Sequence, residues 1–78
     1  MARTLHKLSA RKVATEAKPG RYADGGNLHL LVKASGGKSW VFRYAIGGKE
    51  TDLGLGPVRD VPLSAAREKA AQYRAALA

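Results

Sequence analysis

The sequence predicts an α+β fold in which a three-stranded antiparallel β-sheet packs against a C-terminal α-helix, with a short basic helix ahead of the sheet. Three observations predict this fold. Residues in the middle of the chain alternate between apolar and other types, short glycine-containing segments separate these stretches, and apolar residues near the C-terminus recur every three or four positions. A hydrophobic content of 45% in 78 residues favours one small folded domain over a disordered basic tail.

The predicted sheet begins after Asp24-Gly25-Gly26, a sequence that is typical of a turn. Two strands follow, one on each side of a turn at residues 35–38. Their inward side is formed by Leu28, Leu30, Val32, Trp40, Phe42, Tyr44 and Ile46. Gly47-Gly48 fits a two-residue hairpin loop because glycine adopts positive φ at little cost. Residues 50–55 form the third strand, and the short loops imply an antiparallel meander.

A helix is predicted at each end of the sheet. Ser9 is a candidate N-cap of a short helix over residues 10–17, with Val13 and Ala17 on its inward side and Pro19 ending it. The C-terminal helix has a narrow apolar stripe that should lie on the sheet, formed by Leu63, Ala66, Ala70, Tyr73 and Leu77.

The charge of the chain is strongly positive. It has 14 Lys and Arg residues against six Asp and Glu residues, a net charge of +8. Residues 1–21 hold six basic residues and one acidic residue, so most of the excess lies at the N-terminal end. Such a field favours a polyanionic partner, either nucleic acid or an anionic membrane. Because the sequence has neither an apolar run of roughly 20 residues nor a secretory signal, we expect a cytoplasmic location and no membrane partner.

Sequence features that would indicate an enzyme are missing. There are no cysteines, and His6 and His29 lack the spacing of metal ligands. Gly37-Lys38-Ser39 resembles the end of a phosphate-binding loop, but Val32 stands where that motif requires glycine. No serine has a histidine partner suited to nucleophilic catalysis. We therefore expect no catalytic residue, metal, cofactor or small-molecule substrate in this chain.

The outward side of the predicted sheet is the candidate binding surface. It comprises His29, Leu31, Lys33, Val41, Arg43 and Ala45. A sheet can enter the major groove of DNA and present alternate side chains to base edges. The simpler interpretation is that this side faces water, as in any one-sided antiparallel sheet. The apolar Leu31 and Val41 favour the first interpretation, whereas Trp40, Phe42 and Tyr44 are expected in the core.

Several sequence patterns occur together and in a fixed order. They are Lys7-Leu8-Ser9, KPGRY at residues 18–22, DGGxLxLxV at residues 24–32, SGGKxWxFRY at residues 35–44, LGLG at residues 53–56 and LSAARE at residues 63–68. Over nearly the whole chain, they resemble the beginning of phage and prophage integrases of the tyrosine-recombinase family. One departure is that Glu50 and Asp52 occupy the third strand, where members often have more basic residues, which shifts weight to the N-terminal basic cluster.

The resemblance implies an arm-type DNA-binding domain, with residues 1–78 forming one domain of a longer recombinase. Such a domain recognises short sites beside the core crossover site through a three-stranded sheet in the major groove. The family's core-binding and catalytic domains, with their catalytic Arg, His and Tyr set, would lie outside this sequence. Tyr22, Tyr44 and Tyr73 are therefore not interpreted as the nucleophile. The resemblance also implies activity in a bacterial cell, on chromosomal or phage DNA.

We expect double-stranded DNA to be the main partner. Groove contacts are predicted for His29, Leu31, Lys33, Val41 and Arg43, and phosphate contacts, which position a protein without reading sequence, for Arg3, Lys7, Arg11, Lys12, Arg21 and Lys38. One alternative is a protein-interaction module that uses Leu31, Val41 and the C-terminal helix to bind other integrase subunits or an excision factor. Another is a small RNA-binding domain that uses Tyr22 and the sheet.

Overall fold

The sheet has four strands within the part of the chain that the structure, a computed structural model, describes, which is residues 8–77. The elements in chain order are α1 (Ala10–Thr15), β1 (Gly20–Gly25), β2 (Leu28–Val32), β3 (Lys38–Ile46), β4 (Lys49–Pro57) and α2 (Leu63–Leu77). Each strand pairs with the next in antiparallel orientation, in the order β1-β2-β3-β4. The predicted α+β class, the antiparallel meander and the C-terminal helix are thus confirmed, whereas the predicted number of three strands is wrong.

The additional strand is β1, which covers part of the segment predicted to be only a turn. It pairs with β2 from Gly20 opposite Val32 to Gly25 opposite Leu28. Its inward residues are Gly20, Tyr22 and Asp24, of which only Tyr22 has a large apolar surface. Since a polar residue occupies the most buried inward position, β1 lacks the alternation by which strands are recognised.

The β3–β4 hairpin has the loop that the sequence predicts. Ile46 pairs with Lys49 across Gly47 and Gly48, whose φ values are 60° and 79°. Further along, Trp40 lies opposite Gly56 and Val41 opposite Gly54, so Leu55 is an extra residue in β4. This β-bulge lets Leu55 point into the core, where it is buried.

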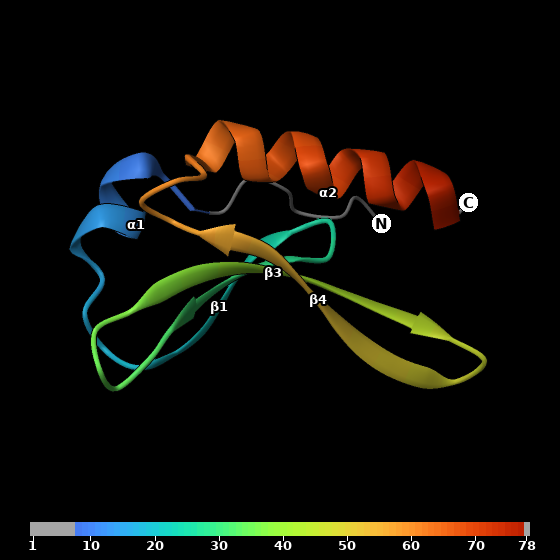
Figure 1. Cartoon of the computed structure of the whole chain (residues 1–78), viewed down its shortest axis with the longest axis horizontal. Helices are drawn as coiled ribbons and strands as arrows, with labels where there is room; N and C mark the ends of the chain where they lie inside the picture. The colour runs from blue at the N-terminus through green and yellow to red at the C-terminus, as the bar shows by residue number, and fades with distance from the viewer. Residues whose placement is uncertain (1–7, 78) are drawn as a thin grey trace.

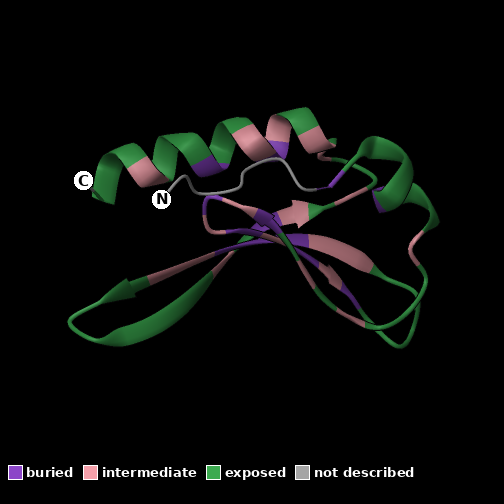
Figure 2. Ribbon diagram, turned by 180° about the vertical axis from the view of Figure 1, so that it is seen from behind, coloured by how far each residue is buried: buried purple, intermediate pink, exposed green. Residues whose placement is uncertain are grey.

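One face of the sheet carries the core, and α2 lies across it (Figure 1). Figure 2 shows that buried residues gather between α2 and the central strands. The core cluster comprises Leu8, Val13, Leu28, Leu30, Val32, Trp40, Phe42, Leu55, Ala66 and Ala70. The small side chains of Ala66 and Ala70 let α2 approach the sheet closely, and Trp40 Nε1 donates a hydrogen bond to Val61 O at 2.7 Å, just before α2. Neither helix within residues 8–77 is long and apolar enough to cross a membrane.

The apolar pattern extends further than the core does. Ile46, Tyr73 and Leu77 are predicted to face inward, yet their exposed fractions are 61%, 40% and 45%. Figure 1 shows the reason, because the β3–β4 hairpin diverges from α2 towards its tip. At the other end, Ser9 caps α1 as predicted, with its hydroxyl accepting a hydrogen bond from the Lys12 amide. This helix ends at Thr15, however, so Ala17 is exposed.

A buried ion pair joins β1, α2 and the segment before α1. Asp24 is only 1% exposed, and Arg67 donates to its two carboxylate oxygens from Nε and Nη2, both at 2.9 Å. The Leu8 amide also donates to Asp24 at 2.9 Å, and Arg67 Nη2 donates to Leu8 O at 2.7 Å. The carboxylate holds the pKa of Arg67 above its usual value. This pair explains why β1 can bury an aspartate.

Replacing Arg67 should therefore destabilise the fold severely. Arg67→Ala leaves the Asp24 carboxylate buried without its main partner, so the free energy of unfolding should fall by about 3–5 kcal/mol. The measurement is urea denaturation followed by Trp40 fluorescence. Arg59→Ala is the control, since the Arg59 side chain is 86% exposed and lies 3.9 Å from its nearest carboxylate oxygen. We expect that change to cost no more than about 0.5 kcal/mol. Equal losses for the two variants would contradict the role of the ion pair.

Candidate nucleic-acid interface

The sheet face opposite α2, here called the outer face, is the candidate interface. Because directly paired residues share a face, the strand register assigns to it Arg21, Ala23, His29, Leu31, Ser39, Val41, Arg43, Ala45, Glu50, Asp52, Gly54 and Pro57. No helix in the described part of the chain covers this face (Figure 1). It contains every predicted groove residue that lies within a strand, and it adds Arg21, Glu50 and Asp52 to them.

An ion pair spans the outer face from edge to edge. Arg21 is on β1 and Asp52 is on β4, and these strands are the two edges of the sheet. The guanidinium uses both terminal nitrogens, with Nη1 at 3.3 Å from Oδ1 and Nη2 at 3.0 Å from Oδ2. This is the two-pronged geometry in which arginine binds a carboxylate or a phosphate. Accordingly the pKa of Asp52 is lowered and that of Arg21 is raised, each mainly by the hydrogen bonds between them.

Two residues of the central strands lie between the ends of this ion pair. Val41 is only 8% exposed although it is not part of the core cluster, and its partner across β2 and β3 is His29. The Nδ1 atom of His29 is buried and has no hydrogen-bond partner among the described residues. Burial lowers the pKa of His29, the positive charges of Arg21 and Arg43 lower it further, and Asp52 opposes them. A neutral histidine thus lies in the centre of the outer face.

Arg43 occupies the hairpin half of the outer face. Its Nε donates to Glu50 Oε2 at 2.5 Å and lies 4.0 Å from Asp52 Oδ1. No hydrogen bond is found for its Nη1 and Nη2 within residues 8–77, so the outer nitrogens of this guanidinium are available to a ligand. The backbone on which Arg43 stands is fixed to the β1–β2 turn, because its amide donates to Asn27 O at 2.9 Å and its carbonyl accepts from Asn27 Nδ2 at 2.8 Å.

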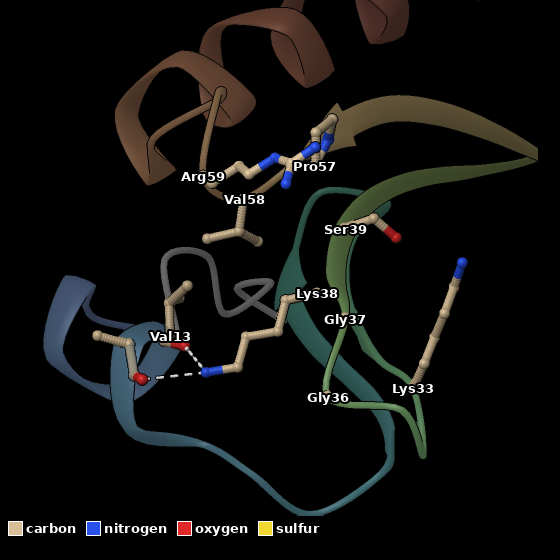
Figure 3. A pocket seen from close by; sticks show the side chains of 10 residues that line it. Val13, Lys33, Gly36, Gly37, Lys38, Ser39, Pro57, Val58 and Arg59 are labelled. Carbon is tan, nitrogen blue, oxygen red and sulfur yellow. Dashed lines mark hydrogen bonds between the residues drawn. The ribbon is translucent and has the colours of Figure 1, made fainter.

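The remaining predicted groove residues lie near the other end of β2. Leu31 is half-buried and faces outward opposite Arg21. Lys33 follows the end of β2, is exposed, and has no ion-pair partner within residues 8–77. In Figure 3 its side chain extends to the opposite side of the β2–β3 pair from that of Lys38. The structure therefore places Lys33 on the same side as the outer face.

The predicted phosphate contacts lie in different environments. Arg11 and Lys12 are exposed on α1, where Lys12 Nζ pairs with Glu16 at 2.8 Å, while Arg11 has no ion-pair partner in the described region. Lys38 Nζ instead donates to Val13 O at 2.8 Å and Ala14 O at 3.0 Å, which attaches the end of α1 to the sheet (Figure 3). Two further predicted contacts, Arg3 and Lys7, lie outside the described residues.

The predicted contact residues do not include Glu50 and Asp52, although the sequence places both on the third strand. Both were visible as acidic residues on a strand of a basic protein, and their alternate spacing was the signal that they share a face. Arg21 was assigned to the N-terminal basic cluster because β1 was not recognised. Once β1 is placed beside β2, Arg21 becomes part of the sheet surface.

The chain belongs to the arm DNA-binding domain family, whose model matches residues 6–78. Among curated proteins, it is 42% identical over 67 residues to an integrase of Shigella phage Sf6. It is equally similar to the prophage integrase IntS of Escherichia coli strain K12. Each match covers 86% of this chain and 17% of the relative, so the chain spans about a sixth of the length of these integrases. The resemblance to phage and prophage integrases is thereby confirmed.

The environment of His29 gives an expected pH dependence of stability. Its pKa is lowered in the folded state, whereas in the unfolded chain it should be about 6.5. Between these two values the unfolded state binds a proton that the folded state does not. The stability should therefore be complete above pH 6.5 and fall as the pH decreases below it.

The measurement is the free energy of unfolding from pH 8 to pH 5, compared between the wild type and His29→Gln. Glutamine removes the titration, so the variant should lose less stability over this range. The lowered pKa of Asp52 affects stability only at more acidic pH, below the usual aspartate pKa of about 3.9. Parallel curves for the two proteins would contradict the lowered pKa of His29.

Proposed function

We propose that this chain binds double-stranded DNA sequence-specifically at arm-type sites during integration and excision by a phage-type recombinase, with the outer face in the major groove. The observation that carries the proposal is an uncovered sheet face, bearing an arginine with unoccupied terminal nitrogens, in a member of the arm DNA-binding domain family. Alternate residues of a sheet can reach base edges in a groove of about 12 Å width. Arg43 is the central base-reading candidate, because arginine binds guanine O6 and N7 with two nitrogens.

The charge distribution supports a division between phosphate and base contacts. The outer face contains Arg21, Arg43, Glu50 and Asp52, whose formal charges cancel, and a histidine whose pKa is lowered. The net charge of +8 therefore comes from residues outside this face, including Arg11 on α1 and Lys33 after β2. We assign phosphate contacts to Arg11, Lys12 and Lys33, together with Arg3 and Lys7. Arg21 and Lys38 would first have to release the groups they bind.

The parent protein is proposed to be an integrase of the tyrosine-recombinase family whose catalytic residues are not in this sequence. Its two relatives named above are integrases, and this chain corresponds to a small part of them. The three tyrosines take part in contacts within the domain. The Tyr22 hydroxyl donates to Lys18 O at 2.6 Å, and the rings of Tyr44 and Tyr73 lie 5.9 and 5.6 Å from that of Phe42.

The structure weakens the two alternative interpretations as first framed. A protein-interaction surface based on Leu31 and Val41 has little area to offer, since Val41 is 8% exposed. Binding of an integrase subunit or excision factor through that surface should depend little on salt. An RNA-binding function would require base stacking on exposed aromatic rings, and the Tyr22 ring lies 6.0 Å beneath the Lys12 ammonium.

The proposal predicts different effects for base and phosphate contacts. The probe is the duplex that the wild-type chain enriches from a randomised pool. Its affinity and that of a scrambled duplex are measured by fluorescence anisotropy. Arg43→Ala should weaken binding to the enriched duplex by about 1–3 kcal/mol and leave the scrambled duplex nearly unaffected. Arg11→Ala should weaken binding to both duplexes equally and reduce the slope of log K against log salt by about 0.9.

The controls distinguish the function classes. If four to six phosphates are contacted, the slope of log K against log salt for the wild type should be about −3.6 to −5.4. Failure to enrich any duplex would reject sequence-specific DNA binding. Preference for single-stranded RNA would favour the RNA-binding alternative, and a slope near zero would favour a protein partner. Equal losses on both duplexes for Arg43→Ala would show that the outer face does not read bases.

A further inference from the structure

The two arginines of the outer face differ in which nitrogens they use. Arg21 binds both oxygens of Asp52 through Nη1 and Nη2, so its two-pronged end is occupied. Arg43 binds Glu50 through Nε, and no hydrogen bond is found for its Nη1 or Nη2 within the described residues. Recognition of guanine by arginine uses a pair of guanidinium nitrogens. Arg43 can offer Nη1 and Nη2 while it stays bound to Glu50, whereas Arg21 cannot offer that pair while it is bound to Asp52.

The β3–β4 hairpin determines where Glu50 stands relative to Arg43. Arg43 is directly opposite Asp52, and Glu50 is directly opposite Ala45, two residues closer to the hairpin loop. Glu50 is therefore the diagonal neighbour of Arg43, a distance that long side chains can bridge on one face of a sheet. Asp52, although directly opposite, comes only to 4.0 Å from the same Nε. The longer side chain at the diagonal position makes the hydrogen bond.

From this geometry we infer that Glu50 is a positioning residue that orients Arg43 for guanine recognition and so determines sequence specificity. The inference rests on the proposed DNA-binding function. A hydrogen bond at Nε restricts the rotation of the guanidinium before DNA arrives, while Nη1 and Nη2 stay available. The Arg43 side chain is 40% exposed and that of Glu50 61%, so the pair contributes little to stability and its effect should appear in binding.

The negative charge of Glu50 should have a second, separate effect. A carboxylate on a DNA-facing surface repels phosphates and so weakens binding to any duplex. Removing Glu50 therefore combines a gain in general affinity with a loss of orientation at Arg43. A test must separate these two effects, and the choice of replacement does so.

The experiment compares Glu50→Ala with Glu50→Gln in the 78-residue chain. Both variants lack the charge, but only glutamine has an oxygen that accepts a hydrogen bond from Arg43 Nε. On the wild-type-enriched duplex, Glu50→Ala should bind about 2- to 10-fold more weakly than Glu50→Gln, because the arginine must be immobilised on binding. On the scrambled duplex the two should bind equally. Glu68→Ala is the control for charge alone, since Glu68 is exposed on α2, away from the outer face.

A second measurement identifies the base. Each guanine of the enriched duplex is replaced in turn by 7-deazaguanine, which lacks the N7 acceptor. One replacement should weaken wild-type and Glu50→Gln binding clearly, and should have a smaller effect on Glu50→Ala. In an Arg43→Met background, whose side chain has no hydrogen-bond donor, the difference between Ala and Gln at position 50 should disappear. Circular dichroism of every variant checks that each remains folded.

The outcomes separate this inference from the function on which it rests. If the wild type enriches no duplex, the proposed function fails and the inference fails with it. If the wild type binds specifically but Ala and Gln at position 50 give the same affinity, the function stands and the positioning role is wrong. If their difference persists in the Arg43→Met background, position 50 acts directly on the DNA rather than through Arg43, which also overturns the inference.

Discussion

The ion pair between Asp24 and Arg67 is the interaction on which the arrangement of the domain depends. It connects the edge strand β1, the helix α2 and the backbone of Leu8 in a single hydrogen-bonded group. A buried carboxylate needs partners of this kind, so docking of α2 on the sheet stabilises β1 in its place beside β2. Because β1 carries Arg21, docking of α2 on one face of the sheet also determines the charges on the other.

The two faces of the sheet use the same residue types for different purposes. On the inner side, the buried Asp24 carboxylate is paired with Arg67, and this pair stabilises the fold. On the outer side, Arg21 and Arg43 meet Asp52 and Glu50 at exposures between 33% and 61%, where water and a ligand can compete for them. The inner pair is held within the core side of the domain, whereas the outer pairs are accessible to a ligand. A basic domain can thus keep arginines oriented on a binding surface without leaving their charges uncompensated.

Most elements could be predicted from the sequence because they follow from local patterns. The strands β2 and β3 show alternation in Leu28 to Val32 and in Trp40 to Phe42, and Gly47-Gly48 predicts the hairpin loop. Strand β1 could not be predicted, because the residue it buries, Asp24, is stabilised by Arg67, which is 43 positions away. Local sequence patterns cannot reveal a pairing between residues so far apart in the chain.

The candidate site was predictable in its location but not in its contacts. Periodicity places Arg43, His29 and Leu31 on one outward side, and the register agrees with that placement. It does not reveal that Arg21 crosses the face to Asp52, or that Val41 is buried between them. Likewise the sequence places Lys38 in a turn, whereas in the structure its Nζ donates hydrogen bonds to the carbonyls at the end of α1. These roles arise from segments that only the tertiary structure brings together.

The compensated charges of the outer face have a consequence for how such a domain would search DNA. Long-range attraction acts between net charges, and here it would act through residues outside the face, such as Arg11 and Lys33. A duplex of any sequence would be held loosely by these cations, and the chain could slide along it. Only where base edges can bind Nη1 and Nη2 of Arg43, beside Glu50, would the face close on the groove. The rate of association would then depend on ionic strength, and the residence time on the DNA sequence.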